Sequence, residues 1–178
     1  MNVPLTFMEA MGLSLPLAMW FVFRRFGRNV TGEMIAGAIV GVVWEIATEP
    51  LWDYHLRLTI YRDIPLAVIA GWSFMLTLVP FLSEKLYCLV LRRSALAARD
   101  KRIFIFDIVS AALICIPLET LGAKAGVWTY RQDLLRWDWG FIPLFNMPYE
   151  LLFGYSLLML IAPTFVRYWE GSFETKDL

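Results

Sequence analysis

The chain has 178 residues, of which 59% are hydrophobic and 18% charged, and its 16 basic and 16 acidic side chains cancel. A soluble domain of this length does not need so much apolar material, whereas a helical bundle in lipid does. The balanced charge argues against a nucleic-acid partner. The composition therefore predicts an integral, multi-pass membrane protein of a plasma, inner or equivalent internal membrane, with the lipid bilayer as its surroundings.

Five apolar stretches are long enough to cross a hydrocarbon core of ~30 Å as helices. The first has no basic region before it and no small-residue cleavage site, so we expect it to be kept as a helix. The fold class that follows is an all-α, polytopic membrane bundle forming a single domain over residues 1–178. Its spans are expected at about 4–23, 33–52, 64–84, 103–121 and 142–165.

The loops after the first and third spans carry most of the basic side chains. These are Arg24, Arg25, Arg28, Arg92, Arg93, Arg99, Lys101 and Arg102. By the positive-inside rule these loops face the cytoplasm, which predicts an outside N-terminus and a cytoplasmic C-terminus. A Gly-x-x-x-Gly pair, Gly37 and Gly41, lies in the second span and favours close packing within the bundle over homodimerisation. A homo- or hetero-oligomer stays open at this stage.

A sequence pattern occurs twice, with corresponding positions about 74 to 78 residues apart. The first copy runs Trp44-Glu45, Trp52-Asp53-Tyr54 and Ile64-Pro65-Leu66. The second runs Pro117-Leu118-Glu119, Trp128-Thr129-Tyr130 and Ile142-Pro143-Leu144, and closes with Pro148-Tyr149-Glu150. The repetition predicts a duplicated two-helix unit, formed by spans two and three and by spans four and five.

Four glutamates are expected on the outer half of the bundle and are the candidate catalytic residues: Glu45, Glu49, Glu119 and Glu150. Removal from water disfavours the charged form of a carboxyl group, so at least one of them is expected to be protonated near neutral pH. That is the state a general acid needs. The structural alternative is that they pair with nearby basic residues or meet water at the membrane interface. The basic residues concerned are Arg57, Arg62, Lys124 and Arg131.

The aromatic residues near these acids are the candidate substrate-binding set: Trp44, Trp52, Tyr54, Trp72, Trp128, Tyr130 and Tyr149. Tryptophan and tyrosine collect at the interfaces of any membrane protein, which is the plain explanation. Several of these, however, recur at fixed spacing from the glutamates, and electron-rich ring faces stabilise a nearby cation. His55, the only histidine, is expected on the surface.

Residues 126–153, with Gly-Val-Trp-Thr-Tyr and Pro148-Tyr149-Glu150, resemble the lycopene cyclase domain of carotenoid pathways. Ile64-Pro65-Leu66-Ala67 followed by Trp72 is similar to membrane carotenoid hydratases, and Trp44-Glu45 resembles fungal meroterpenoid cyclases. The second acid of the cyclase motif is Leu151 here, and five spans are fewer than that family's six or seven. The resemblance implies acid-initiated isoprenoid chemistry without a cofactor.

The leading hypothesis is thus a membrane terpene cyclase, of the isomerase or lyase class, that protonates a polyene double bond or epoxide. No glycine-rich phosphate loop and no aspartate-rich magnesium motif is present, so no metal ion or cofactor is expected. An isoprenoid would enter laterally or from the outer interface. A carotenoid-type hydratase is the first alternative, and a non-enzymatic lipid-binding or transport subunit is the second.

Overall fold

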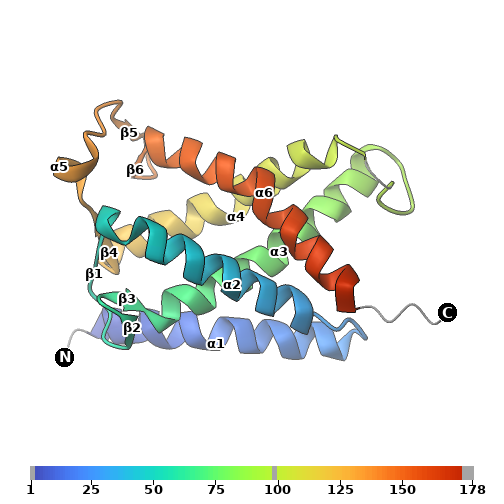
Figure 1. Cartoon of the computed structure of the whole chain (residues 1–178), viewed down its shortest axis with the longest axis horizontal. Helices are drawn as coiled ribbons and strands as arrows, with labels where there is room; N and C mark the ends of the chain where they lie inside the picture. Colours follow the sequence, from blue (N-terminus) through green and yellow to red (C-terminus); the bar gives the residue numbers. More distant parts are fainter. Residues whose placement is uncertain (1–2, 98–99, 174–178) are drawn as a thin grey trace.

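Long helices make up most of the molecule, which a computed structural model describes over residues 3–97 and 100–173 (Figure 1). Within these ranges five helices are long and apolar enough to cross a membrane. They are α1 (Val3–Arg25), α2 (Thr31–Thr48), α3 (Leu66–Val90), α4 (Ile103–Lys124) and α6 (Tyr149–Phe173). The helices are consistent with the multi-pass membrane protein that the composition predicts.

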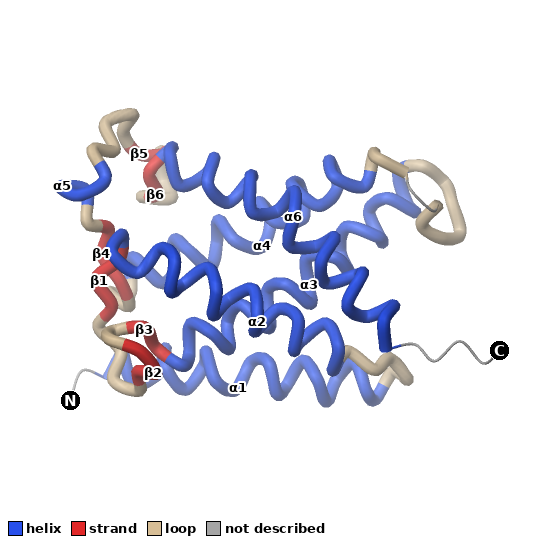
Figure 2. The backbone as a smooth tube through the Cα atoms, in the orientation of Figure 1, coloured by secondary structure: helices blue, strands red, loops and turns tan. Residues whose placement is uncertain are grey.

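The short elements gather at the end of the bundle where the N-terminus lies, as Figure 2 shows. In the first half these are η1 (Glu49–Leu51), β1 (Trp52–Tyr54), β2 (Thr59–Tyr61) and β3 (Ile64–Pro65). In the second half they are β4 (Trp128–Tyr130), α5 (Gln132–Leu135), β5 (Phe141–Ile142) and β6 (Met147–Pro148). The helical prediction therefore describes the spans, while the loops at this end add small antiparallel sheets.

The two Trp-x-Tyr segments pair with each other as the antiparallel strands β1 and β4. Trp52 lies opposite Tyr130, and Tyr54 lies opposite Trp128. Because side chains alternate along a strand and opposed residues share a face, all four aromatic rings project to the same side of this ladder. That side faces the bundle, since Trp52 and Tyr54 are buried. The Trp and Tyr of each segment are two residues apart, so both side chains lie on the same face of the strand and point into the bundle.

The last long helix begins at Tyr149, seven residues later than the span expected from 142. Residues 141–148 instead form the hairpin β5–β6, in which Ile142 pairs with Met147. Its turn contains Leu144 and Asn146 with positive φ angles of 71° and 53°, a backbone conformation that cannot continue a helix. Apolar residues in this hairpin mimic the start of a span, although the backbone there is extended.

Helix α3 is the centre of the bundle and packs against α1, α2, α4 and α6. Its contact with α2 depends on the two glycines of the Gly-x-x-x-Gly pair. A Cβ atom at Gly41 would lie 2.4 Å from the Cβ of Trp72, and one at Gly37 would lie 3.1 Å from the Cα of Ser73. The interpretation of this pair as internal packing is confirmed, because a methyl group at either position would push the helices apart.

Ion pairs hold together the end of the bundle opposite the strands. The Arg167 guanidinium donates to both carboxylate oxygens of Asp107, at 2.9 and 2.7 Å, and to Glu84 at 3.0 Å. Asp107 is completely buried. The charge of this aspartate is therefore neutralised by a two-pronged contact between α4 and α6, with α3 supplying the third member.

Candidate functional site

Glu45 lies on α2 near the end of the bundle that carries the β-strands (the strand end), and it is only 3% exposed. The Tyr54 hydroxyl donates a hydrogen bond to its Oε2 atom at 2.5 Å. The Trp72 indole N–H donates to its Oε1 atom at 2.6 Å. The carboxyl group is thus held between strand β1 and helix α3 by two neutral donors, and both of its oxygens have a partner.

Glu119 occupies the corresponding place on α4 and is 6% exposed. Its Oε1 atom accepts hydrogen bonds from the Trp128 indole N–H at 3.0 Å and from the Tyr130 hydroxyl at 2.9 Å. The Tyr155 hydroxyl, which comes from α6, donates to Oε2 at 2.8 Å. Three neutral donors from two different elements therefore fix this carboxyl group.

The two carboxyl groups are held by corresponding positions of the chain. Each accepts from the tyrosine of its own Trp-x-Tyr strand. Each also accepts from an aromatic residue that follows a proline by seven positions, Trp72 after Pro65 and Tyr155 after Pro148. Tyr155 was not among the predicted substrate-binding residues. The sequence does contain a signal for Tyr155. If Pro65 is aligned with Pro148, which directly precedes α6, instead of with Pro143, then Trp72 aligns with Tyr155.

Both glutamates line one cavity of about 160 Å³. The described lining is otherwise almost entirely apolar or aromatic. It consists of Met8, Met11, Gly12, Leu15, Trp52, Tyr54, Leu56, Ala67, Val68, Gly71, Trp72, Phe74, Met75, Cys115, Leu118, Leu121, Gly122, Val127, Trp128 and Tyr155, together with Glu45 and Glu119. An apolar pocket with a few convergent polar groups is the usual form of a small-molecule site.

Gly122 makes room for the Trp128 ring, which lies close over helix α4. A Cβ atom at this glycine would lie 2.0 Å from the ring, so any side chain would displace the indole. Trp52 is placed differently, because its indole N–H donates to the Thr48 hydroxyl at 3.2 Å instead of to a glutamate. Its ring packs against Tyr130, with centroids 5.4 Å apart. The two half-sites are therefore similar but not identical.

The tyrosines of the β1–β4 ladder are kept in their hydroxyl form. Burial raises the pKa of Tyr54 well above its ordinary value, and the nearby Glu45 carboxyl raises it further. The pKa of Tyr130 is raised in the same direction, first by burial and then by Glu119. Both hydroxyls thus remain donors at any physiological pH. Among the described residues, no basic side chain pairs with either glutamate.

The structure places the other predicted acids outside the cavity lining. Glu49 is buried but forms an ion pair with Arg62 at 2.7 Å, which is the structural alternative considered for it. Glu150 accepts a hydrogen bond from the Trp139 backbone N–H at 2.8 Å and holds the loop before α6. The sequence correctly predicts that Glu49 and Glu150 lie at the same end of the bundle as Glu45 and Glu119. Their side chains, however, bind Arg62 and the Trp139 backbone and do not line the cavity.

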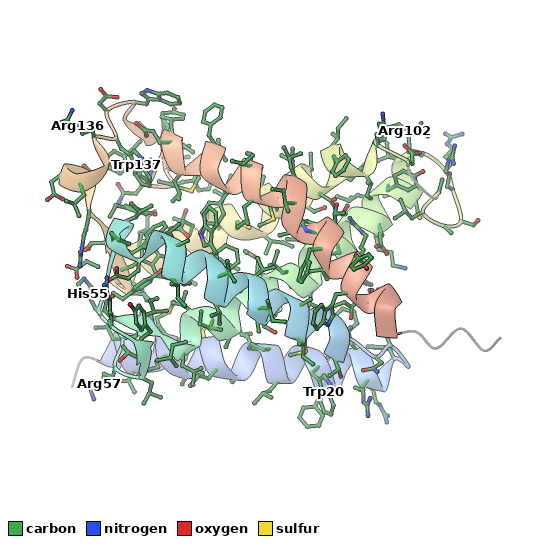
Figure 3. The ribbon with its side chains drawn as sticks, in the orientation of Figure 1. Trp20, His55, Arg57, Arg102, Arg136 and Trp137 are labelled. Atoms are coloured by element: carbon green, nitrogen blue, oxygen red, sulfur yellow. The ribbon has the colours of Figure 1, made fainter. Side chains whose placement is uncertain are left out.

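Three of the predicted aromatic residues also lie outside the described lining. Trp44 packs beside Trp72, with ring centroids 6.3 Å apart. Tyr149 is 37% exposed at the start of α6. Tyr130 donates a hydrogen bond to Glu119 but is not among the described lining residues. Trp52, Tyr54, Trp72 and Trp128 do line the cavity. His55 lies exposed at the strand end of the molecule, labelled in Figure 3.

Within the described ranges, no three histidine, cysteine, aspartate or glutamate side chains are grouped so that they could hold a metal ion. Comparison of the chain with protein-family models, with curated proteins and with solved structures gave no match. The residues of the site supply two carboxyl groups, five neutral hydrogen-bond donors and an aromatic wall around an apolar space.

Proposed function

We propose that this protein is an integral membrane isoprenoid cyclase in which a glutamate protonates a double bond or an epoxide of a polyene. The observation that carries the proposal is the pair of buried carboxyl groups, Glu45 and Glu119, on one apolar cavity. An acid at membrane depth is energetically expensive, and such acids mark functional sites by default. Without a basic partner among the described residues, either carboxyl group is free to carry a proton.

The proposed reaction divides two proton transfers between the pair. One carboxyl group gives its proton to a carbon of the terminal double bond or to the epoxide oxygen. A second double bond of the polyene attacks the resulting cation and closes a ring, which moves the positive charge to a ring carbon. The other glutamate, present as carboxylate, removes a proton beside that carbon and leaves a new double bond. The acid glutamate then takes a proton from water and the other glutamate releases its proton to water, which resets the site.

The surrounding residues suit each of these steps. The aromatic rings of Trp52, Trp72 and Trp128 line the cavity and stabilise positive charge on the substrate through their faces. The tyrosine hydroxyls and indole N–H groups stabilise whichever glutamate is charged, because hydrogen bonds to a charged acceptor are about twice as strong as neutral ones. The product is an isomer of the substrate, so the reaction consumes no oxidant, reductant or cofactor.

A duplicated two-helix unit, oriented with the strand end outside, is part of the same proposal. The order α2–β1–β2–β3–α3, with η1 after α2, recurs as α4–β4–β5–β6–α6, with α5 after β4, which supports duplication. Glu33 and Asp107 share the 74-residue separation of Glu45 and Glu119, and Pro80 and Pro163 share the 83-residue separation of Pro65 and Pro148. The basic loops at the opposite end support a cytoplasmic position for that end.

The experiment that tests the function is incubation of the purified protein, in lipid nanodiscs, with a panel of acyclic polyenes and polyene epoxides. Mass spectrometry then separates the hypotheses. A product of unchanged mass and altered chromatographic retention supports the cyclase. A product that has gained one water supports the hydratase, and no conversion of any panel member supports a non-enzymatic lipid-binding or transport role.

A further inference from the structure

We infer that an uncharged isoprenoid reaches the cavity from the hydrocarbon layer, between α1 and α4, and that Met11, Leu15 and Leu118 determine which chains fit. The inference rests on the proposed function for the chemical class of the ligand. It adds the route, the residues that select the chain, and the exclusion of a charged head group at the acids.

Helix α1 forms one wall of the cavity without belonging to the central packing. Met8, Met11, Gly12 and Leu15 follow the spacing of a single helix face, and all four line the cavity. Within the described residues, α1 packs extensively against α3 alone. The gap between α1 and α4 is therefore bordered by side chains on each side and is not closed by helix packing.

Burial changes along the lining and locates the mouth of the cavity. The residues at the acids, such as Trp72 and Cys115, are buried. Leu15 on α1 and Leu118 on α4 are half-buried, and Leu121, one turn further along α4, is 45% exposed. At the strand end the buried Leu56 and Val127 and the β1–β4 ladder close the cavity. Access is thus lateral, and the outer interface is blocked.

One difference between the two halves explains why the cavity lies on the α1 side. The residue directly before each glutamate is Trp44 in α2 and Leu118 in α4. Trp44 packs into the hydrophobic core beside Trp72, whereas Leu118 lines the cavity. A leucine in place of an indole leaves space beside Glu119, and residues of α1 line that space.

The volume and lining of the cavity limit what it encloses. An apolar cavity of about 150 Å³ in another protein holds one benzene molecule. The present cavity of about 160 Å³ therefore encloses one ring-sized end of a chain, and the rest of the isoprenoid lies between α1 and α4 or in lipid. No lysine or arginine is among the described lining residues, so a diphosphate group has no counter-charge there.

The test measures binding separately from catalysis. Lycopene, an achiral polyene, is added to the protein in phosphatidylcholine nanodiscs, and the circular dichroism induced in its visible absorption band reports the bound fraction. Met11→Trp, Leu15→Trp and Leu118→Trp fill the route. Leu17→Trp and Leu113→Trp are matched controls, since these leucines are 60% and 59% exposed on the same two helices. Leu118→Phe is the milder variant, and far-ultraviolet circular dichroism and gel filtration check the fold of each protein.

We expect the three route variants to weaken lycopene binding at least about tenfold, because overpacking a filled site costs roughly that much, and the two controls to bind like the wild type. Wild-type binding in all route variants, or equal losses in the controls, overturns the inference. Lycopene binding by the wild type together with no conversion of any polyene or epoxide in the panel would refute the cyclase proposal while leaving the route intact. Absence of an induced signal with the wild type also overturns the inference, whereas the cyclase proposal is decided separately by the panel of substrates.

Discussion

At one end of the bundle Asp107 and Glu84 bind Arg167, whereas at the other end Glu45 and Glu119 accept hydrogen bonds from neutral tyrosine and tryptophan side chains. Both ends bury acids inside apolar helices. Only the second pair lines the apolar cavity. The guanidinium supplies the counter-charge for the first pair, which suits a structural contact. Neutral donors leave the second pair able to exist with or without a proton.

The comparison also shows how similar positions acquire different chemistry. Glu84 and Arg167 lie 83 residues apart, the separation that relates Trp72 to Tyr155. At the far end the two helices α3 and α6 thus carry opposite charges, and at the strand end they carry two aromatic donors. The consequence is an ion-paired cytoplasmic end in the proposed orientation and an uncharged donor set around the proposed active site.

The largest expected effect is on activity, from removal of the exchangeable acid at the cavity. Glu45→Gln and Glu119→Gln keep size and hydrogen bonding, and each should lower turnover by ~10²–10⁴-fold, the usual contribution of a general acid or base. Glu49→Gln is the control, because that glutamate is also buried but is ion-paired with Arg62. Turnover is measured by product formation in nanodiscs. Equal losses in all three variants would remove the distinction between the acids.

Substitution at the ion-paired end of the bundle should lower the stability of the protein instead of its activity. Arg167→Met leaves the buried Asp107 carboxylate without its partner, and breaking such a pair costs about 3–5 kcal/mol. We expect a correspondingly lower midpoint in denaturant titrations followed by circular dichroism. The fraction that remains folded should keep its turnover number. If Arg167→Met were as stable as the wild type but inactive, the ion-paired end would take part in function, which would contradict the proposed position of the active site.

Loss of a single hydroxyl should have an intermediate effect. Tyr54→Phe removes one of two donors to Glu45, whereas Tyr155→Phe removes one of three donors to Glu119. A hydrogen bond to a charged group is worth about 1.5–3 kcal/mol, so each change should lower turnover roughly 10- to 100-fold if the bond strengthens during reaction. Initial rates of the two variants provide the measurement. Rates unchanged in both would mean that these donors do not act on the reacting charge.

The smallest effect concerns pH. Because the pKa values of Tyr54 and Tyr130 are raised in the folded protein, both keep their protons where an unfolded tyrosine, with a pKa of about 10, loses its own. The folded state therefore binds more protons above pH ~10 and loses stability as the pH rises further. Ultraviolet titration of the folded protein should give the same phenolate signal at pH ~11 with and without Tyr54→Phe. A smaller signal in the variant would contradict the burial argument.

The sequence predicts the parts of the site that repeat. The two glutamates Glu45 and Glu119 form one pair, and the two Trp-x-Tyr segments form another. Both pairs stand out because their members are separated by similar numbers of residues. Tyr155 was missed because the hairpin before α6 shifts the second copy, so that an alignment on Ile-Pro-Leu ends at the wrong proline. The separation is 74 residues between Glu45 and Glu119 but 83 residues between Pro65 and Pro148, because the second loop is longer. Periodicity along the helices cannot reveal such a difference in loop length.

Other features depend on contacts that no local pattern encodes. Glu49 and Glu45 lie one helical turn apart and look alike in the sequence, but only Glu49 meets Arg62. Helix α1 also has apolar side chains on its exposed side, with Phe7 and Phe21 exposed at 61% and 65%. The composition of α1 therefore does not distinguish its cavity-lining face, which includes Met8 and Met11, from its other apolar face. Which acid is paired and which apolar face meets the cavity are decided by tertiary packing.

The most direct test of the central claim is the reaction of an acyclic hydrocarbon polyene in D₂O. If Glu45 or Glu119 protonates a carbon of the substrate, every ring formed by the wild type should carry one solvent-derived deuterium, seen as one additional mass unit per ring. Neither Glu45→Gln nor Glu119→Gln should form this product at a comparable rate. Cyclised product without deuterium, or full labelling by the double variant, would contradict the account.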